Sequence, residues 1–289
     1  MTNINDLLDL LDLQQKDKQD FVGKSYTVGS PNVFGGQVVA QALNAAYRTI
    51  ANNRILHSMH AYFLEPGDLE VPIDYKVTVM RDGGSFSVRR VTALQNDTVI
   101  FILACSFHKD EPGYNHQTDL DREVPEPESL QSWTELLENF GTMLPGRLKS
   151  FLDIPRPVEF KPTYIANPME HKDLPPRNAI WFKFKGDIPA HDLPIKQQLL
   201  SYVSDYNILG VTLNPHASEL HWGNAQTASL DHSMWFFRDF EINDWLLYSL
   251  EAVSNSNARG FARGNIYTRE GVLVASVAQE GMIRPKDKR

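Results

Sequence analysis

An aspartate stands at a position that helices disfavour. Asp205 follows Ser204, close to the end of a helix that the sequence predicts from the start signals Asp192 and Pro194 to about Asn207. A carboxylate there faces the negative end of the helix dipole, at a cost of about 0.3–1 kcal/mol. A charge kept at such a cost amid apolar neighbours is a candidate for proton-transfer chemistry. A solvent-exposed aspartate with no function is the alternative interpretation.

Two uncharged polar residues lie in predicted strands of the same half of the chain. Ser229 precedes Leu230-Asp231-His232, and Gln279 ends the apolar run 273–278. A buried amide must find hydrogen-bond partners or cost about 1–3 kcal/mol. For Gln279 a satisfied structural amide and a site residue both remain open.

Short motifs of other chemistries are missing from the sequence. There is no G-x-S-x-G elbow, no phosphate-binding glycine loop, no dinucleotide fingerprint and no H-E-x-x-H. His57 and His60 form the only close histidine pair, and positions three apart in a strand are expected on opposite faces. We therefore expect neither a metal nor a cofactor. Cys105 ends an apolar strand and is expected to be a buried structural thiol.

Two stretches, 57–107 and 232–281, look like copies of one module. Both open on His-Ser-Met, 175 positions apart, and both run through a short turn into an apolar strand. A unit of this length is about the size of a small domain. Aligned through the turn, Gln279 of the second copy falls where Cys105 stands in the first. The duplication predicts a pseudo-symmetric body in which one half can keep a chemistry that the other has lost.

Each copy is expected to hold one buried helix and a run of antiparallel strands, an α+β arrangement. The helix after Phe34-Gly35-Gly36 has small or apolar residues on nearly every face, which is typical of a buried helix. Strands are expected at 57–64, 73–81, 85–94, 98–108, 179–185, 226–237, 245–253, 258–268 and 272–283. The predicted units are 1–110, a proline-rich linker at 111–178, and 179–289.

Bulk composition narrows the class of protein. The 289 residues are 42% hydrophobic and 22% charged, as in ordinary globular proteins, and a net charge of −8 argues against a nucleic-acid surface. No apolar stretch reaches the roughly 20 residues of a membrane helix. The first residues lack the pattern of a signal peptide, and one cysteine fits a reducing compartment. We expect a cytoplasmic protein.

Six blocks of sequence resemble the signature segments of the acyl-CoA thioesterase II family. They are 34–42, 57–68, 85–91, 231–236, 258–261 and 275–281. The resemblance implies a double hotdog, in which two antiparallel sheets, each wrapped around a central helix, are fused in one chain. It also implies hydrolysis of fatty acyl-CoA to free fatty acid and CoA, and a homo-oligomer, dimer or tetramer.

The resemblance further implies the catalytic residues. The family uses an Asp on the second hotdog helix, a Thr on the strand before the D-H-S-M-W block and a Gln near the C-terminus, which here match Asp205, Ser229 and Gln279. Serine departs from the usual threonine: it keeps the hydroxyl but lacks the methyl that stiffens the rotamer. Asp205 would activate a water that Ser229 and Gln279 orient, and backbone N–H groups, such as those at a helix start, would face the oxyanion.

The anionic nucleotide of CoA needs basic residues at the mouth of such a site. Candidates are Arg89, Arg90, Arg259 and Arg263, with solvated strand positions as the alternative.

Two other functions stay open on sequence alone. Hotdog enoyl-CoA hydratases pair an Asp with a His five residues later, whereas the residue five after Asp205 is Gly210. A non-catalytic acyl-CoA-binding protein is the second alternative.

Overall fold

The computed structural model describes residues 1–120, 123–142, 144, 146–165, 170, 172–188, 192–220 and 224–286. Its first part contains α1 (Ile4–Leu11), β1 (Gln14–Asp17), β2 (Asp20–Gly23), α2 (Gly35–Tyr47), β3 (Arg54–Phe63), β4 (Ile73–Asp82), β5 (Phe86–Gln95) and β6 (Thr98–Lys109). The expected linker carries η1 (Pro127–Ser129), α3 (Trp133–Phe140), α4 (Gly146–Leu152) and β7 (Val158–Pro162). Within that linker, residues 121, 122, 143, 145, 166–169 and 171 lie outside the described ranges.

The second part repeats the order of strand, helix and strands. It contains β8 (Arg177–Phe184), α5 (Leu193–Ser204), η2 (Gly210–His216), β9 (Ala225–Ser229), β10 (Asp231–Phe236), β11 (Leu246–Ser256), β12 (Arg259–Thr268) and β13 (Leu273–Pro285). The strand expected at 226–237 is divided at Leu230 into β9 and β10, which pair with successive segments of β13.

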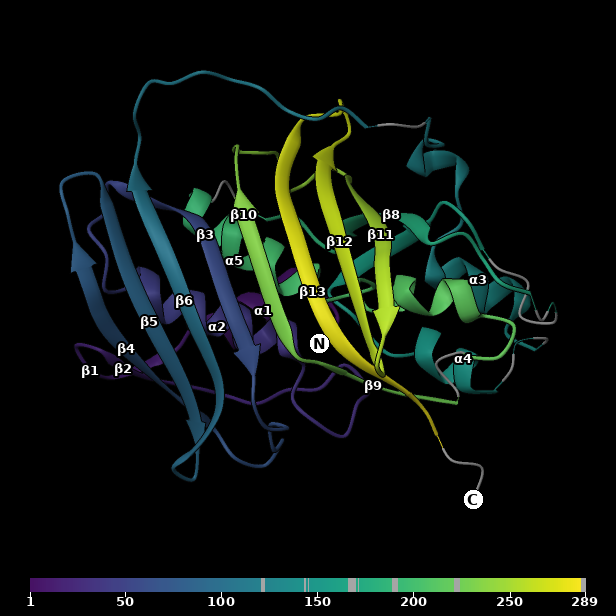
Figure 1. The fold of residues 1–289 in the computed structure, drawn as a ribbon, viewed down its shortest axis with the longest axis horizontal. Helices are drawn as coiled ribbons and strands as arrows, with labels where there is room; N and C mark the ends of the chain where they lie inside the picture. The colour runs from purple at the N-terminus through teal and green to yellow at the C-terminus, as the bar shows by residue number, and fades with distance from the viewer. Residues whose placement is uncertain are drawn as a thin grey trace.

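The strands of the two modules form one sheet. Along the described residues the order is β1-β2-β4-β5-β6-β3-β10-β13-β12-β11-β8-β7, with β9 beside β13. Strands β3 and β10 join the halves in antiparallel pairing, so the two His-Ser-Met blocks meet and Met59 lies opposite Met234. Figure 1 shows these two strands side by side, with α2 and α5 behind the sheet. The double hotdog is confirmed, and the two sheets are continuous edge to edge.

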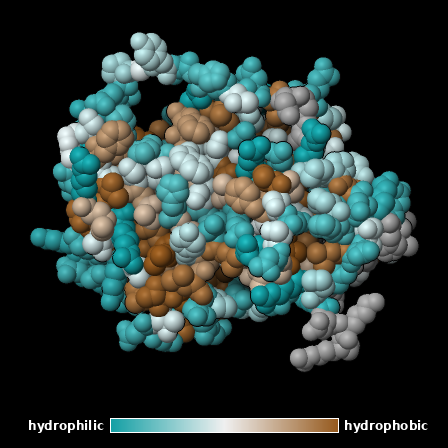
Figure 2. Space-filling model, in the orientation of Figure 1, coloured by the Kyte–Doolittle hydropathy of each residue, from teal (hydrophilic) through white to brown (hydrophobic). Residues whose placement is uncertain are grey.

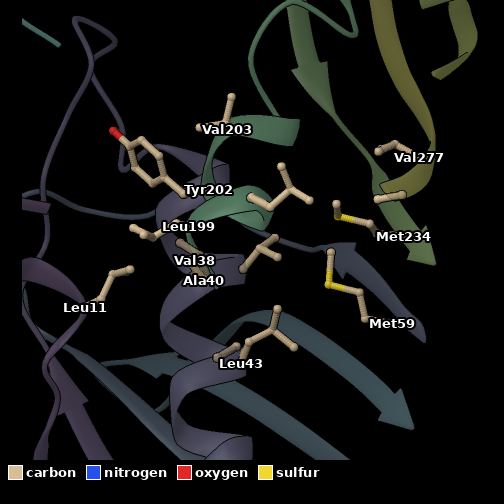
Figure 3. Packing of buried hydrophobic residues seen from close by; sticks show 14 of the residues in the cluster. Leu11, Val38, Ala40, Leu43, Met59, Leu199, Tyr202, Val203, Met234 and Val277 are labelled. Carbon is tan, nitrogen blue, oxygen red and sulfur yellow. The ribbon is translucent and has the colours of Figure 1, made fainter. Parts of the chain in front are cut away.

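The two central helices pack against each other in the concave side of the sheet. Their interface is mostly apolar, and Figure 3 shows Val38 and Ala40 beside Leu199, with the side chains of Met59 and Met234 close to each other. Two polar contacts cross it: Asn44 Nδ2 donates to Gln198 Oε1 at 3.0 Å, and the Tyr47 hydroxyl donates to Gln197 Oε1. The expectation of a buried helix in each module is therefore confirmed, and the small side chains expected after Gly36 are buried along α2. Close packing of α2 on α5 fixes how the start of one helix meets the end of the other.

The expectation that His57 and His60 face opposite sides is wrong. A β-bulge between Leu56 and Ser58 adds an unpaired residue to β3, which breaks the alternation of side chains. His57 contacts Ser106 Oγ at 2.8 Å, and His60 contacts Ser233 Oγ at 3.1 Å, so both rings lie on the outer face of the sheet. Each histidine is engaged by a serine of a neighbouring strand.

Cys105 is buried, as expected for a structural thiol. Its Sγ lies 3.7 Å from the backbone oxygen of Arg89. Burial raises the pKa of the thiol far above its ordinary value, and the charge of Arg89 only partly opposes this. Because the thiolate is the nucleophilic form, Cys105 is unreactive in the folded protein.

The outer face of the sheet carries both polar and apolar side chains. Figure 2, viewed as in Figure 1, shows brown apolar atoms between teal polar ones on this face. Exposed apolar side chains of the strands include Tyr62, Met80 and Phe86. Among the described residues, no helix is long and apolar enough to cross a membrane.

Candidate active site

Asp205 caps a helix that belongs to the other module. It ends α5 as its C-cap residue, where the dipole of α5 disfavours a negative charge. Its Oδ2 accepts the backbone N–H of Gly36 at 2.8 Å, in the first turn of α2. Helix α2 has Phe34 at its N-cap and no side-chain cap of its own. The positive end of α2 therefore offsets the unfavourable end of α5 and holds the carboxylate in place.

Two glycines permit this close approach of the helices. A Cβ on Gly36 would lie 2.3 Å from the backbone oxygen of Tyr202, in the last turn of α5. A Cβ on Gly35 would lie 2.7 Å from Asp205 Oδ2. A larger residue at either position would disturb the contact between the start of α2 and the carboxylate.

Ser229 and Gln279 converge on the same carboxylate. Gln279 lies on β13 and is 0% exposed, and Ser229 ends β9, which pairs with β13 through Gly281. The Gln279 amide donates to Asp205 Oδ1 at 3.2 Å and to Ser229 Oγ at 2.9 Å. Ser229 Oγ lies 3.5 Å from Asp205 Oδ1, a long hydrogen bond. The structure thus brings all three residues expected from the sequence into one cluster, from α5, β9 and β13.

A buried histidine, which the sequence reasoning did not assign to the site, stands behind this cluster. His232 on β10 is 0% exposed. Its Nδ1 contacts Gln279 Oε1, and its Nε2 contacts Ser204 Oγ at 2.9 Å. Strand periodicity carried the missing signal, because alternation places His232 on the core side with Met234. A histidine on a core face must find hydrogen-bond partners.

Burial raises the pKa values of several groups around the cluster. Burial raises the pKa values of Tyr202 and Tyr206, and the charge of Asp205 adds to the effect on Tyr206. Both phenols are therefore protonated, with their oxygens 3.1 Å apart. Burial also raises the pKa of Asp231, although the N–H of Glu280, which donates to it at 2.7 Å, opposes the shift.

The arginines expected near CoA differ in their positions. Arg89 is 2% exposed, donates to Thr49 and pairs with Asp82, so its assignment to a surface mouth is wrong. Arg89 lies on β5, and its guanidinium donates to Thr49, just beyond the C-terminal end of α2. A cation is favoured there by the dipole of the helix, so Arg89 is a structural arginine. Arg259 pairs with Glu280 at 2.9 Å, Arg263 pairs with Glu251 at 2.8 Å, and Arg90 is exposed on β5.

The cluster offers acid–base chemistry that does not require a covalent intermediate on a side chain. A carboxylate fixed by backbone, amide and hydroxyl donors can accept a proton from a hydrogen-bonded water. Across the described ranges, no three residues of the His, Cys, Asp and Glu types are grouped so that they could hold a metal ion.

Comparisons with known proteins agree with this fold. A family model described as acyl-CoA thioesterase matches residues 149–282, and a model described as acyl-CoA thioesterase N-terminal domain matches residues 24–108. Acyl-CoA thioesterase 2 of Haemophilus influenzae is 39% identical over 281 residues, which cover 97% of this chain and 98% of the relative. Acyl-coenzyme A thioesterase 8 of Homo sapiens is 35% identical over 286 residues, 96% of this chain and 88% of the relative.

A solved structure extends the agreement to three dimensions. The acyl-CoA thioesterase II TesB2 from Mycobacterium marinum superposes with a TM-score of 0.79 at 31% identity, over 97% of this chain and 99% of that one. Sequence and structure thus match over nearly the whole length. The chain belongs to the acyl-CoA thioesterase family.

Proposed function

We propose that this protein hydrolyses fatty acyl-CoA thioesters with a water molecule that Asp205 activates. The observation that carries the proposal is the convergence of three donors on one carboxylate: the Gly36 N–H, the Gln279 amide and the Ser229 hydroxyl. Family membership and the names of the relatives support the substrate class.

The chemistry requires a water, a base and donors for the developing oxyanion. Asp205 accepts a proton as the water oxygen bonds to the thioester carbonyl carbon. Ser229 and Gln279 fix the line of attack. The N-terminal end of α2 lies at the cluster and favours the negative charge that develops on the carbonyl oxygen. The carbon–sulfur bond then breaks, and the proton passes to the leaving thiolate, so the products are a fatty acid and CoA.

Release of free CoA is the direct test. The protein is mixed with saturated acyl-CoA esters of increasing chain length in the presence of a chromogenic thiol reagent. We expect continuous release of thiol over a defined range of lengths. The buried Cys105 contributes little background, which a reaction without substrate checks. Tight binding of acyl-CoA without release would instead identify a binding protein.

Substitutions at Ser229 test the role of its hydroxyl. Ser229→Ala removes a partner of both Asp205 and Gln279, and we expect kcat to fall about tenfold, the equivalent of one hydrogen bond. Ser229→Thr keeps the hydroxyl and is expected to retain most of the activity. Steady-state kinetics on the preferred ester measures both. Full activity of the alanine variant would remove Ser229 from the site.

A further inference from the structure

The direction of the Gln279 amide is central to the site. Its Nε2 has two hydrogens, and both are used, one toward Asp205 and one toward Ser229. A reversed amide would place Oε1 against the Asp205 carboxylate and withdraw both donors. The terminal torsion of glutamine is broad, so the side chain itself selects neither direction. Another group must fix the amide.

We propose that His232 is the positioning residue that fixes it. The Nδ1–H of His232 donates to Gln279 Oε1, which is the only arrangement that leaves both amide hydrogens for Asp205 and Ser229. Because Oε1 is thereby satisfied, reversal of the amide would set its NH2 group against the Nδ1–H donor. This role rests on the proposed function, since it acts through Gln279 on the activated water.

The His232 ring also contacts the residue that precedes Asp205, the proposed base. Its Nε2 lies 2.9 Å from Ser204 Oγ, and Ser204 immediately precedes Asp205. The backbone carbonyl oxygen of Ser204 accepts a hydrogen bond from the Tyr248 hydroxyl at 2.9 Å. His232 therefore ties the amide on β13 to the last turn of α5, the two elements whose relative position sets the distance between Gln279 and Asp205.

Comparison of the two modules supports a specific role. The expectation that Cys105 is the counterpart of Gln279 is wrong. Phe86 and Phe261 match between the modules, and the residues that follow them, Ser87 and Ala262, pair with Phe107 and Gln279. Phe107 therefore stands where Gln279 stands in the second module, so the first module has no amide to orient. Its matching histidine, His57, faces outward at the bulge of β3 and contacts Ser106. Only the copy with the amide keeps its histidine in the core. A general packing requirement for this histidine would apply to both copies.

A matched pair of variants separates positioning from packing. An asparagine amide reaches the Nδ1 position of a histidine, whereas a glutamine amide reaches the Nε2 position. We expect His232→Gln to lower kcat about tenfold to a hundredfold with little change in KM, because it loses the donor to Gln279. His232→Asn should retain most of kcat. Equal loss in both variants, or a more active glutamine variant, would overturn the proposal.

Two further measurements keep the test independent of folding. In a Gln279→Ala background, His232→Gln should cause no additional loss of kcat, and a full additional loss would contradict the inference. In the wild-type protein, nitrogen NMR of the His232 ring should show a proton on Nδ1, and an unprotonated Nδ1 would also contradict it. If Gln279→Ala alone leaves activity unchanged, the proposed site fails. If that variant is slow but His232→Gln is fully active, only the positioning role fails.

Discussion

Replacing Asp205 with asparagine is expected to lower kcat for acyl-CoA hydrolysis by about 10²–10⁴-fold, the range for loss of a general base. The amide cannot accept the proton that the attacking water loses. It also has one acceptor oxygen where the carboxylate has two, so it cannot serve both the Gly36 N–H and the donors of Ser229 and Gln279. The free energy of unfolding should therefore fall by about 1 kcal/mol, and the fold should be retained.

The control is a surface aspartate with an ordinary ion pair. Asp74 on β4 pairs with Lys16 at 2.7 Å, with both side chains exposed, and Asp74→Asn should change neither activity nor melting temperature appreciably. Kinetics with the preferred ester and thermal unfolding are measured on both variants. Wild-type turnover by the Asp205→Asn protein would show that the base lies elsewhere.

Much of the fold could be predicted because its signals are local or repeated. The His-Ser-Met repeat gave the pseudo-symmetry, and the structure explains it, since Met59 and Met234 are paired where the halves meet. The bulge at His57 could not be read from periodicity, because an unpaired residue depends on the partner strand. The burial of Arg89 has the same origin: its partners Thr49 and Asp82 lie on other elements.

The site was only half accessible to sequence reasoning. The helix dipole identified Asp205 as a misplaced charge, but the compensating N–H of Gly36 lies 169 positions away and belongs to the other module. The first module therefore contributes a group to the site itself. Its helix supplies the backbone donor that stabilises the carboxylate, although its own counterpart of Gln279 is Phe107.

This dependence makes Gly36→Ala the second large expected effect. Its Cβ would lie 2.3 Å from the backbone oxygen of Tyr202 and 2.6 Å from the ring of Phe34. Backbone cannot yield as a flexible side chain does, so the start of α2 must move away from α5. We expect the free energy of unfolding to fall by about 1–3 kcal/mol, as for other overpacked sites. Activity should fall about a hundredfold, because the contact that positions Asp205 is lost.

Gly35→Ala is the matched comparison, and Gly84→Ala is the control. A Cβ at Gly35 meets the end of the Asp205 side chain at 2.7 Å, which can shift at less cost to the fold, so activity should fall more than stability. A Cβ at Gly84 meets nothing within 4 Å, and neither property should change. Melting temperature and kcat/KM are measured for all three. Gly36→Ala could instead have the same melting temperature and the same kcat/KM as the Gly84→Ala control. In that case the contact between α2 and α5 does not hold the Asp205 carboxylate, and the inferred dependence of the site on the first module is wrong.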